Sequence, residues 1–132
     1  MVLTDAQLGN LDEDDVSRLV GEITRIVRGE NDLASMGERL HNLNYVMKPE
    51  FVEKVLKRCF KVPYMAINFF KWVKLKDGFS CTTEIYNMML YVAGEAKEFR
   101  LVENLLQEMD NYSLNKDIRT WTILISQYGK AK

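Results

Sequence analysis

The sequence lacks the residue patterns of most metal, redox and phosphate-binding enzymes. Its two cysteines, Cys59 and Cys81, form no CxxC pair, so neither a disulfide framework nor a zinc site is predicted, and both are expected to be reduced structural thiols. The single histidine, His41, belongs to no metal-ligand or catalytic motif. No GxGxxG or GK[ST] motif and no set of nucleophile, base and orienting group is present. We therefore predict no enzymatic activity, no metal and no cofactor.

Long apolar runs are also missing. No stretch approaches the roughly 20 residues that a membrane span needs, so we expect no membrane partner. The opening MVLTDAQLGNLDEDD is acidic, whereas a transit peptide is basic, so no targeting segment is visible in the sequence. What is present is a chain of 132 residues, 47% hydrophobic and 28% charged, which is typical of a globular domain with one sizeable core.

The net charge of −1 hides an asymmetry along the chain. Residues 1–44 carry a net charge of −5 and residues 45–132 a net charge of +4, so an anionic partner should prefer the second part. Much of this positive charge falls between residues 48 and 76, on Lys48, Lys54, Lys57, Arg58, Lys61, Lys71, Lys74 and Lys76. Two interpretations stay open: the run attracts an RNA backbone, or it forms the solvated face of amphipathic helices.

Apolar residues recur at three- and four-residue spacing, whereas strand alternation is absent. This pattern predicts seven helices, in residues 12–30, 31–43, 48–60, 62–79, 81–94, 97–110 and 118–132. Pro49 and Pro63 stand at likely first helical positions, and Gly78 and Gly94 are expected to end helices. Short connections between such helices favour antiparallel hairpins, and small hairpins bury their faces by stacking on one another.

The sequence repeats itself at a constant offset of 35 residues. Residues 83 onward match residues 118 onward in the pairs Tyr86/Trp121, Asn87/Thr122, Met89/Leu124, Leu90/Ile125, Gly94/Gly129 and Ala96/Ala131. A series of matches at one constant offset predicts a repeat protein. The aromatic residues Trp72, Trp121, Tyr86 and Phe70 could stack on bases, but helical spacing favours a place in the hairpin core.

The segment TEIYNMMLYVAGEAKEFRLVENLLQEMDNYSLNKD, residues 83–117, resembles the pentatricopeptide repeat family. Tyr86 and Asn87 match the aromatic-Asn start of the family's 35-residue unit, Met109 the end of its second helix and Asp117 its last residue. The resemblance implies an all-α, right-handed solenoid of helical hairpins. It also implies a plant organellar, P-type-like protein, of which this chain would be the N-terminal fragment.

The resemblance divides the chain into four parts. Residues 1–47 would be a helical lead-in or cap, 48–82 a degenerate hairpin, 83–117 a complete repeat and 118–132 the first helix of a following repeat. The family reads one base of single-stranded RNA per repeat with the fifth and last residues of the unit.

In the complete repeat these two residues are Asn87 and Asp117, a combination that implies uridine. Thr122 occupies the fifth position of the next unit and implies a purine. The second residues, Glu84 and Arg119, would flank the base; the guanidinium could stack on it, whereas the carboxylate would place negative charge near phosphate.

The expected function is sequence-specific binding of single-stranded RNA in the mitochondrion, or alternatively the chloroplast. In the family such binding serves RNA stability, processing, splicing, editing or translation. A second hypothesis stays open, since helical repeats also bind proteins. The segment could be an interaction scaffold, a cap or homodimerisation segment, or part of a larger ribonucleoprotein such as a ribosome.

Overall fold

The computed structural model describes residues 13–29, 32–43 and 47–131, and these residues form seven α-helices and no strand. The helices are α2 (Glu13–Gly29), α3 (Leu33–His41), α4 (Pro49–Arg58), α5 (Pro63–Lys74), α6 (Thr83–Glu95), α7 (Phe99–Asn111) and α8 (Ile118–Lys130). The all-α prediction is confirmed. None of the helices within the described ranges is both long and apolar enough to cross a membrane.

Local chemistry explains where several helices begin. Proline stands in the first turn of α4 and of α5, where its missing N–H costs no hydrogen bond. Thr82 caps α6 by accepting a hydrogen bond from the backbone N–H of Ile85, and Asp32 caps α3 in the same way through Ser35. These caps fix the ends of the helices, so the loops between hairpins can be short.

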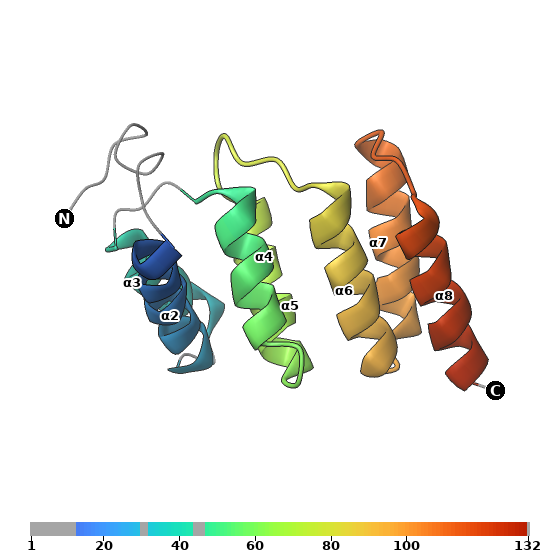
Figure 1. Ribbon diagram of the computed structural model, residues 1–132, viewed down its shortest axis with the longest axis horizontal. Helices are drawn as coiled ribbons and strands as arrows, with labels where there is room; N and C mark the ends of the chain where they lie inside the picture. The colour runs from blue at the N-terminus through green and yellow to red at the C-terminus, as the bar shows by residue number, and fades with distance from the viewer. Residues whose placement is uncertain (1–12, 30–31, 44–46, 132) are drawn as a thin grey trace.

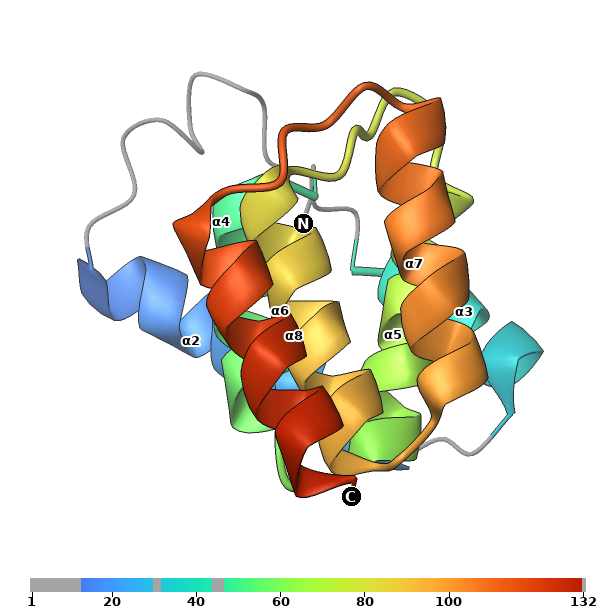
Figure 2. The ribbon, with the colours of Figure 1, turned by 90° about the vertical axis from the view of Figure 1, so that its right-hand side faces the viewer.

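The helices form two layers (Figures 1 and 2). One layer contains α2, α4, α6 and α8, and each of these helices packs on the next. The other layer contains α3, α5 and α7, which lie behind the first layer in Figure 1. Helices α2, α4 and α6 of the first layer each turn back into a helix of the second, and Figure 1 shows these pairs following one another along the long axis in chain order. This arrangement confirms the predicted solenoid of helical hairpins.

Helix α6 is the centre of the C-terminal half, because it packs against α4, α5, α7 and α8. Tyr86 shows how it joins its neighbours. Its ring meets Phe70 edge-on at a centroid distance of 5.5 Å, and its hydroxyl donates to Glu108 Oε1 at 2.9 Å. Lys74 Nζ donates to the same carboxylate oxygen at 2.9 Å. One side chain of α6 is thereby tied to both α5 and α7, and the prediction that Tyr86 and Phe70 belong to the core is confirmed.

Helix α8 differs from α6 in one respect. Its apolar residues Ile118, Trp121 and Ile125 are exposed, with 53% of Trp121 accessible to solvent. The prediction that Trp121 lies in the hairpin core is therefore wrong for the part of the chain that the structure describes. The residues that match Trp121 and Ile125 at the 35-residue offset, Tyr86 and Leu90, are buried in α6. Within the described residues no helix packs on α8 as α7 packs on α6. The fold therefore presents an apolar helix face at its C-terminal end.

Two glycine predictions were wrong. Helix α5 ends at Lys74, and Gly78 supplies a φ of +78° in the turn that follows. Gly94 lies inside α6 rather than at its end, and Lys97 makes the left-handed turn after the helix, with a φ of 60°. A side chain at Gly94 would collide with Gln127 of α8, whose Cδ and Cβ lie 2.7 and 2.8 Å from an added Cβ. The glycine is therefore required by close helix packing and not by a turn.

Gly94→Ala should destabilise the protein by about 1–3 kcal/mol, because the buried Gln127 side chain and α8 must move. The matched control is Gly129→Ala in α8, where an added Cβ meets nothing within 4 Å. This change should stabilise the helix by about 0.5–1 kcal/mol. Urea unfolding of both variants measures the difference, and equal midpoints would contradict the packing role of Gly94.

Candidate nucleic-acid interface

The structure brings Asn87 and Asp117 into contact. Asn87 lies in α6, and Asp117 is the N-cap residue of α8. Because α6 and α8 pack side by side, the amide Nδ2 of Asn87 donates a hydrogen bond to Asp117 Oδ1 at 3.1 Å. The fifth and last residues of the predicted repeat are therefore neighbours in space. Their role in reading a base stays a prediction.

A third residue, Thr120, completes this network. Its backbone N–H donates to Asp117 Oδ1 at 2.9 Å, and its Oγ1 accepts from the Asp117 backbone N–H at 3.1 Å, which forms a capping box. The Thr120 hydroxyl also donates to Asn87 Oδ1 at 2.5 Å. The amide of Asn87 is thereby oriented, with its oxygen toward Thr120 and its nitrogen toward Asp117. The sequence analysis missed Thr120, although an Asp-x-x-Thr pattern at a helix start is a signal for such a box.

The network leaves Asn87 with unused hydrogen-bonding capacity. An Asn amide has two N–H groups and two oxygen lone pairs, of which the network uses one each. Asn87 is one of the residues that line a cleft of about 250 Å³, together with Phe60, Met88, Tyr91, Arg119 and Ile123. The residue itself is fully buried. A base edge can therefore reach the amide only after a covering side chain moves.

Glu84 and Arg119, the predicted flanking residues, also meet in the structure. Arg119 Nη1 lies 3.3 Å from Glu84 Oε1, and 63% of the Arg119 side chain is exposed. The ion pair compensates the negative charge of Glu84 at this cleft. An exposed pair of this kind contributes only about 0–1 kcal/mol, so breaking it costs little.

The other sequence candidates lie apart from this network. Thr122 is exposed on α8 and donates its hydroxyl to the backbone oxygen of Ile118 at 2.9 Å. The rings of Phe60 and Tyr91, which lie 5.3 Å apart, form the apolar wall of the cleft. Sequence spacing gave no signal for Phe60, because it follows the end of α4 and reaches α6 only through tertiary packing.

The basic run does not form a single surface. Lys54 and Arg58 lie on α4, whereas Lys74 lies on α5 in the other layer. Lys74 is ion-paired with Glu108, and Lys76 lies over the Trp72 ring at 5.0 Å. Lys74 and Lys76 are thus engaged in contacts within the protein, and Lys54 of α4 lies 3.8 Å from Glu50. Only the α4 part of the run lies on the layer that carries Asn87.

The cysteines are not reactive groups in this structure. Both are free thiols. Burial raises the pKa of Cys81 to about 11 and also raises the pKa of Cys59 above its ordinary value, so both thiols are protonated at neutral pH. Among the residues that the structure describes, no group of three His, Cys, Asp or Glu side chains is placed to hold a metal ion.

Asp117 should make the stability of the protein depend on pH. The hydrogen bond from the Thr120 backbone N–H, with smaller contributions from the Asn87 and Thr120 side chains, holds the pKa of Asp117 below its ordinary value of 3.8. In acid the unfolded chain therefore binds more protons at this residue, so its stabilising contribution is full above the unfolded pKa and is lost as pH falls through the folded pKa.

Asp117→Asn keeps a capping side chain but removes the charge. We expect the variant to be less stable than the native protein at pH 7, with the difference shrinking as pH falls below about 4. Urea unfolding of both proteins between pH 2 and 7 measures this difference in stability. A difference that is constant over this range would contradict the assignment to Asp117.

Thr120→Val should destabilise the protein by about 1–3 kcal/mol, because the buried Asn87 oxygen loses its donor. Thr120→Ser keeps the hydroxyl and loses one methyl group, so it should cost about 1 kcal/mol or less. Thermal or urea unfolding compares the two variants. If Thr120→Val is as stable as Thr120→Ser, the Thr120 hydroxyl does not hold Asn87.

Comparison with known proteins identifies relatives in Arabidopsis thaliana. One mitochondrial pentatricopeptide repeat-containing protein is 57% identical over 109 residues, which are 83% of this chain and 11% of the relative. A second is 28% identical over 93 residues, which are 70% of this chain and 18% of the relative. A protein of the small ribosomal subunit is 26% identical over 110 residues, which are 83% of this chain and 16% of the relative.

The chain thus spans about a tenth to a fifth of the length of these curated relatives. No family model and no solved structure matches it. The mitochondrial names support the expected location, and a chloroplastic repeat protein that is 25% identical over 125 residues matches the stated alternative. The first of these relatives is highly identical to this chain over most of its length. The fold adds two supporting features, its stacked hairpins and the 35-residue interval between the starts of α6 and α8. The chain therefore belongs to the pentatricopeptide repeat family.

Proposed function

We propose that this chain takes part in sequence-specific binding of single-stranded RNA in the mitochondrion, as one section of a longer array of hairpins. Its units would be residues 48–82, 83–117 and 118–132, preceded by a helical cap in residues 1–47. The observation that carries the proposal is the oriented amide of Asn87, held by Asp117 and Thr120 in the lining of a cleft. We infer that the complete unit reads a uridine.

The orientation of the amide explains a preference for uridine over cytosine. The unused N–H of Asn87 can donate to uracil O4 while the unused lone pair of its Oδ1 accepts from uracil N3–H. Cytosine offers the reverse pattern at these two base positions, an acceptor at N3 beside an amino donor. Pairing with cytosine would require the amide to flip, which would turn its oxygen toward the Asp117 carboxylate. The lost hydrogen bond and the repulsion between oxygens oppose that flip.

One such unit cannot bind RNA tightly. Stacking and edge contacts supply about 1–3 kcal/mol per base, whereas even a millimolar complex requires about 4 kcal/mol. Binding by this chain alone is therefore weak, and tight binding needs many units acting together. The greater length of the relatives supports such an array.

A second candidate function is a protein-interaction segment. The exposed apolar face of α8 favours it, and one relative is a protein of the small ribosomal subunit. The equivalence of α8 with α6 supports a different occupant for this face, namely the second helix of the following hairpin, placed as α7 is placed on α6. We therefore rank RNA binding first and treat a partner protein or a second copy of the chain as outcomes to be tested.

The direct test is selection of bound sequences from a random RNA pool by the full-length protein that contains this chain. The native protein should select a site with uridine at one position. Asn87→Thr should shift that single position toward guanine, because a hydroxyl replaces the amide that pairs with uracil. The matched control is Asn104→Thr on α7, an exposed residue of the other layer, which should leave every position unchanged.

Two results would count against the proposal. If no sequence is enriched, this protein does not read RNA, and the interaction segment becomes the better account. If a sequence is enriched but Asn87→Thr behaves as Asn104→Thr does, RNA is bound and Asn87 does not read it.

A further inference from the structure

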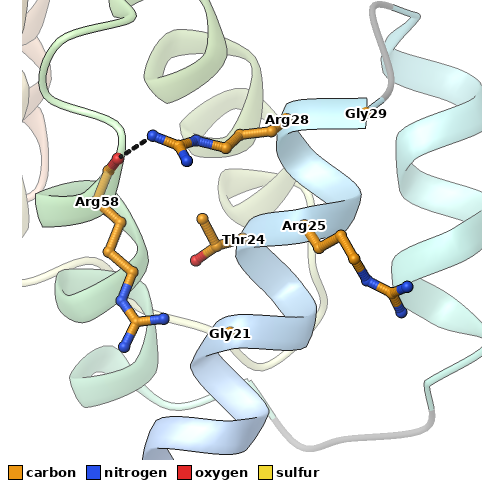
Figure 3. Close-up of a pocket in the computed structure, with 6 residues that line it drawn as sticks. All are labelled: Gly21, Thr24, Arg25, Arg28, Gly29 and Arg58. Atoms are coloured by element: carbon orange, nitrogen blue, oxygen red, sulfur yellow. Dashed lines mark hydrogen bonds between the residues drawn. The ribbon is translucent and has the colours of Figure 1, made fainter.

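A second cleft, of about 630 Å³, opens between α2 and α4 (Figure 3). Its lining residues are Gly21, Thr24, Arg25, Arg28, Gly29 and Arg58. Arg28 lies in the last turn of α2, and Arg58 is the last residue of α4. Neither of these two guanidinium groups forms an ion pair with any residue in the described parts of the chain. The cleft therefore concentrates positive charge that the described protein does not neutralise.

The two arginines are held in place by backbone features. Arg28 Nη2 donates to the backbone oxygen of Arg58 at 3.2 Å, which fixes its guanidinium group beside α4 and leaves most of its N–H groups unused. The Arg58 side chain runs past Gly21, where an added Cβ would lie 3.5 Å from its Nη1. Arg25 also lines the cleft, but in Figure 3 its side chain points away from Arg28 and Arg58. It therefore adds positive charge nearby and makes no contact with these two residues. The 3.5 Å distance at Gly21 is an ordinary van der Waals contact, so it places the Arg58 guanidinium beside Gly21 without making glycine necessary there.

The chemistry of this cleft suits a phosphate group. A guanidinium group offers parallel N–H donors that match two phosphate oxygens. In Figure 3 the Arg28 and Arg58 guanidinium groups point to different ends of the cleft, so each offers its own donors to an anion that enters it. No acidic side chain lines the cleft within the residues described. Arg58 also lines a neighbouring hollow together with Lys54, Lys57, Glu13 and Asp14. The two carboxylates there would repel an anion, so the cleft that Arg58 shares with Arg28 is the better place for one.

We propose that the Arg28–Arg58 cleft binds a phosphate group, and that a phosphodiester of the bound RNA strand supplies it. The source of the phosphate rests on the proposed function, whereas the cleft itself does not. The cleft lies between two helices of the layer that also carries Asn87, and the other side of that layer is covered by α3, α5 and α7. A strand that extends along the uncovered side from Asn87 toward α2 would bring its backbone to the two arginines.

The test is an NMR titration of this chain at low salt, first with inorganic phosphate and then with a uridine oligomer that has no terminal phosphate. Both ligands should shift the backbone amides of Gly21 and Gly29. Arg58→Gln and Arg28→Gln should each weaken phosphate binding at least fivefold, and each should lower the salt slope of oligomer binding by about one. Arg100→Gln, which removes an exposed charge from α7, is the matched control and should change the affinity by less than twofold.

Arg58→Gln is the cleaner variant, because the backbone oxygen that Arg28 contacts stays in place. The proposal that this cleft binds phosphate would be overturned if Arg58→Gln and Arg100→Gln changed the phosphate affinity equally. It would also be overturned if neither ligand shifted the amides of Gly21 and Gly29. If phosphate shifts these amides and the oligomer does not, RNA is not the source of the phosphate. Shifts at Asn87 without shifts at the cleft would overturn this inference and leave the proposed function standing. Capture of an acidic peptide in preference to the oligomer would also contradict it.

Discussion

The close contact between α6 and α8 is the constraint on which the rest of this structure depends. Gly94 allows the two helices to approach until Gln127 lies against the α6 backbone, and at the other end of the contact Asn87, Asp117 and Thr120 join the helices by hydrogen bonds. Without this approach Asp117 would still cap α8, but Asn87 would have no fixed partner. The same contact that stacks one unit on the next therefore also orients the proposed reading amide.

Because the contact between α6 and α8 both stacks the units and orients Asn87, the proposed site is buried. A reading residue on a flexible surface would rotate freely, and its amide could present either face to a base. Here Thr120 and Asp117 remove that freedom, at the cost of covering Asn87 by its neighbours. The ion pair of Arg119 and Glu84 beside the network is exposed, so under the proposed function it is the contact that would open for a base.

Apolar spacing predicted the seven helices, and the resemblance to the repeat family singled out Asn87 and Asp117 as a pair. The hydrogen bond between these two residues came from the structure. The sequence did not predict the role of Gly94, since a glycine near a helix end is more often a turn than a packing site. Thr120, Phe60 and the Arg28–Arg58 cleft were missed for another reason. Phe60, the cleft and the contact of Thr120 with Asn87 each depend on a residue that is distant in sequence, which tertiary packing alone brings close. The capping box of Thr120 with Asp117 did have a local signal.

The most direct measurement is photocrosslinking of the full-length protein to its selected RNA, with 4-thiouridine placed at one position at a time. If the uridine of this unit meets Asn87, the crosslink at that position maps to α6 or to the start of α8, around Met88, Tyr91 and Arg119, which line the cleft. Crosslinks from that position to α5 or α7 would place the RNA on the other layer. That result would contradict the claim that packing between α6 and α8 builds the reading site.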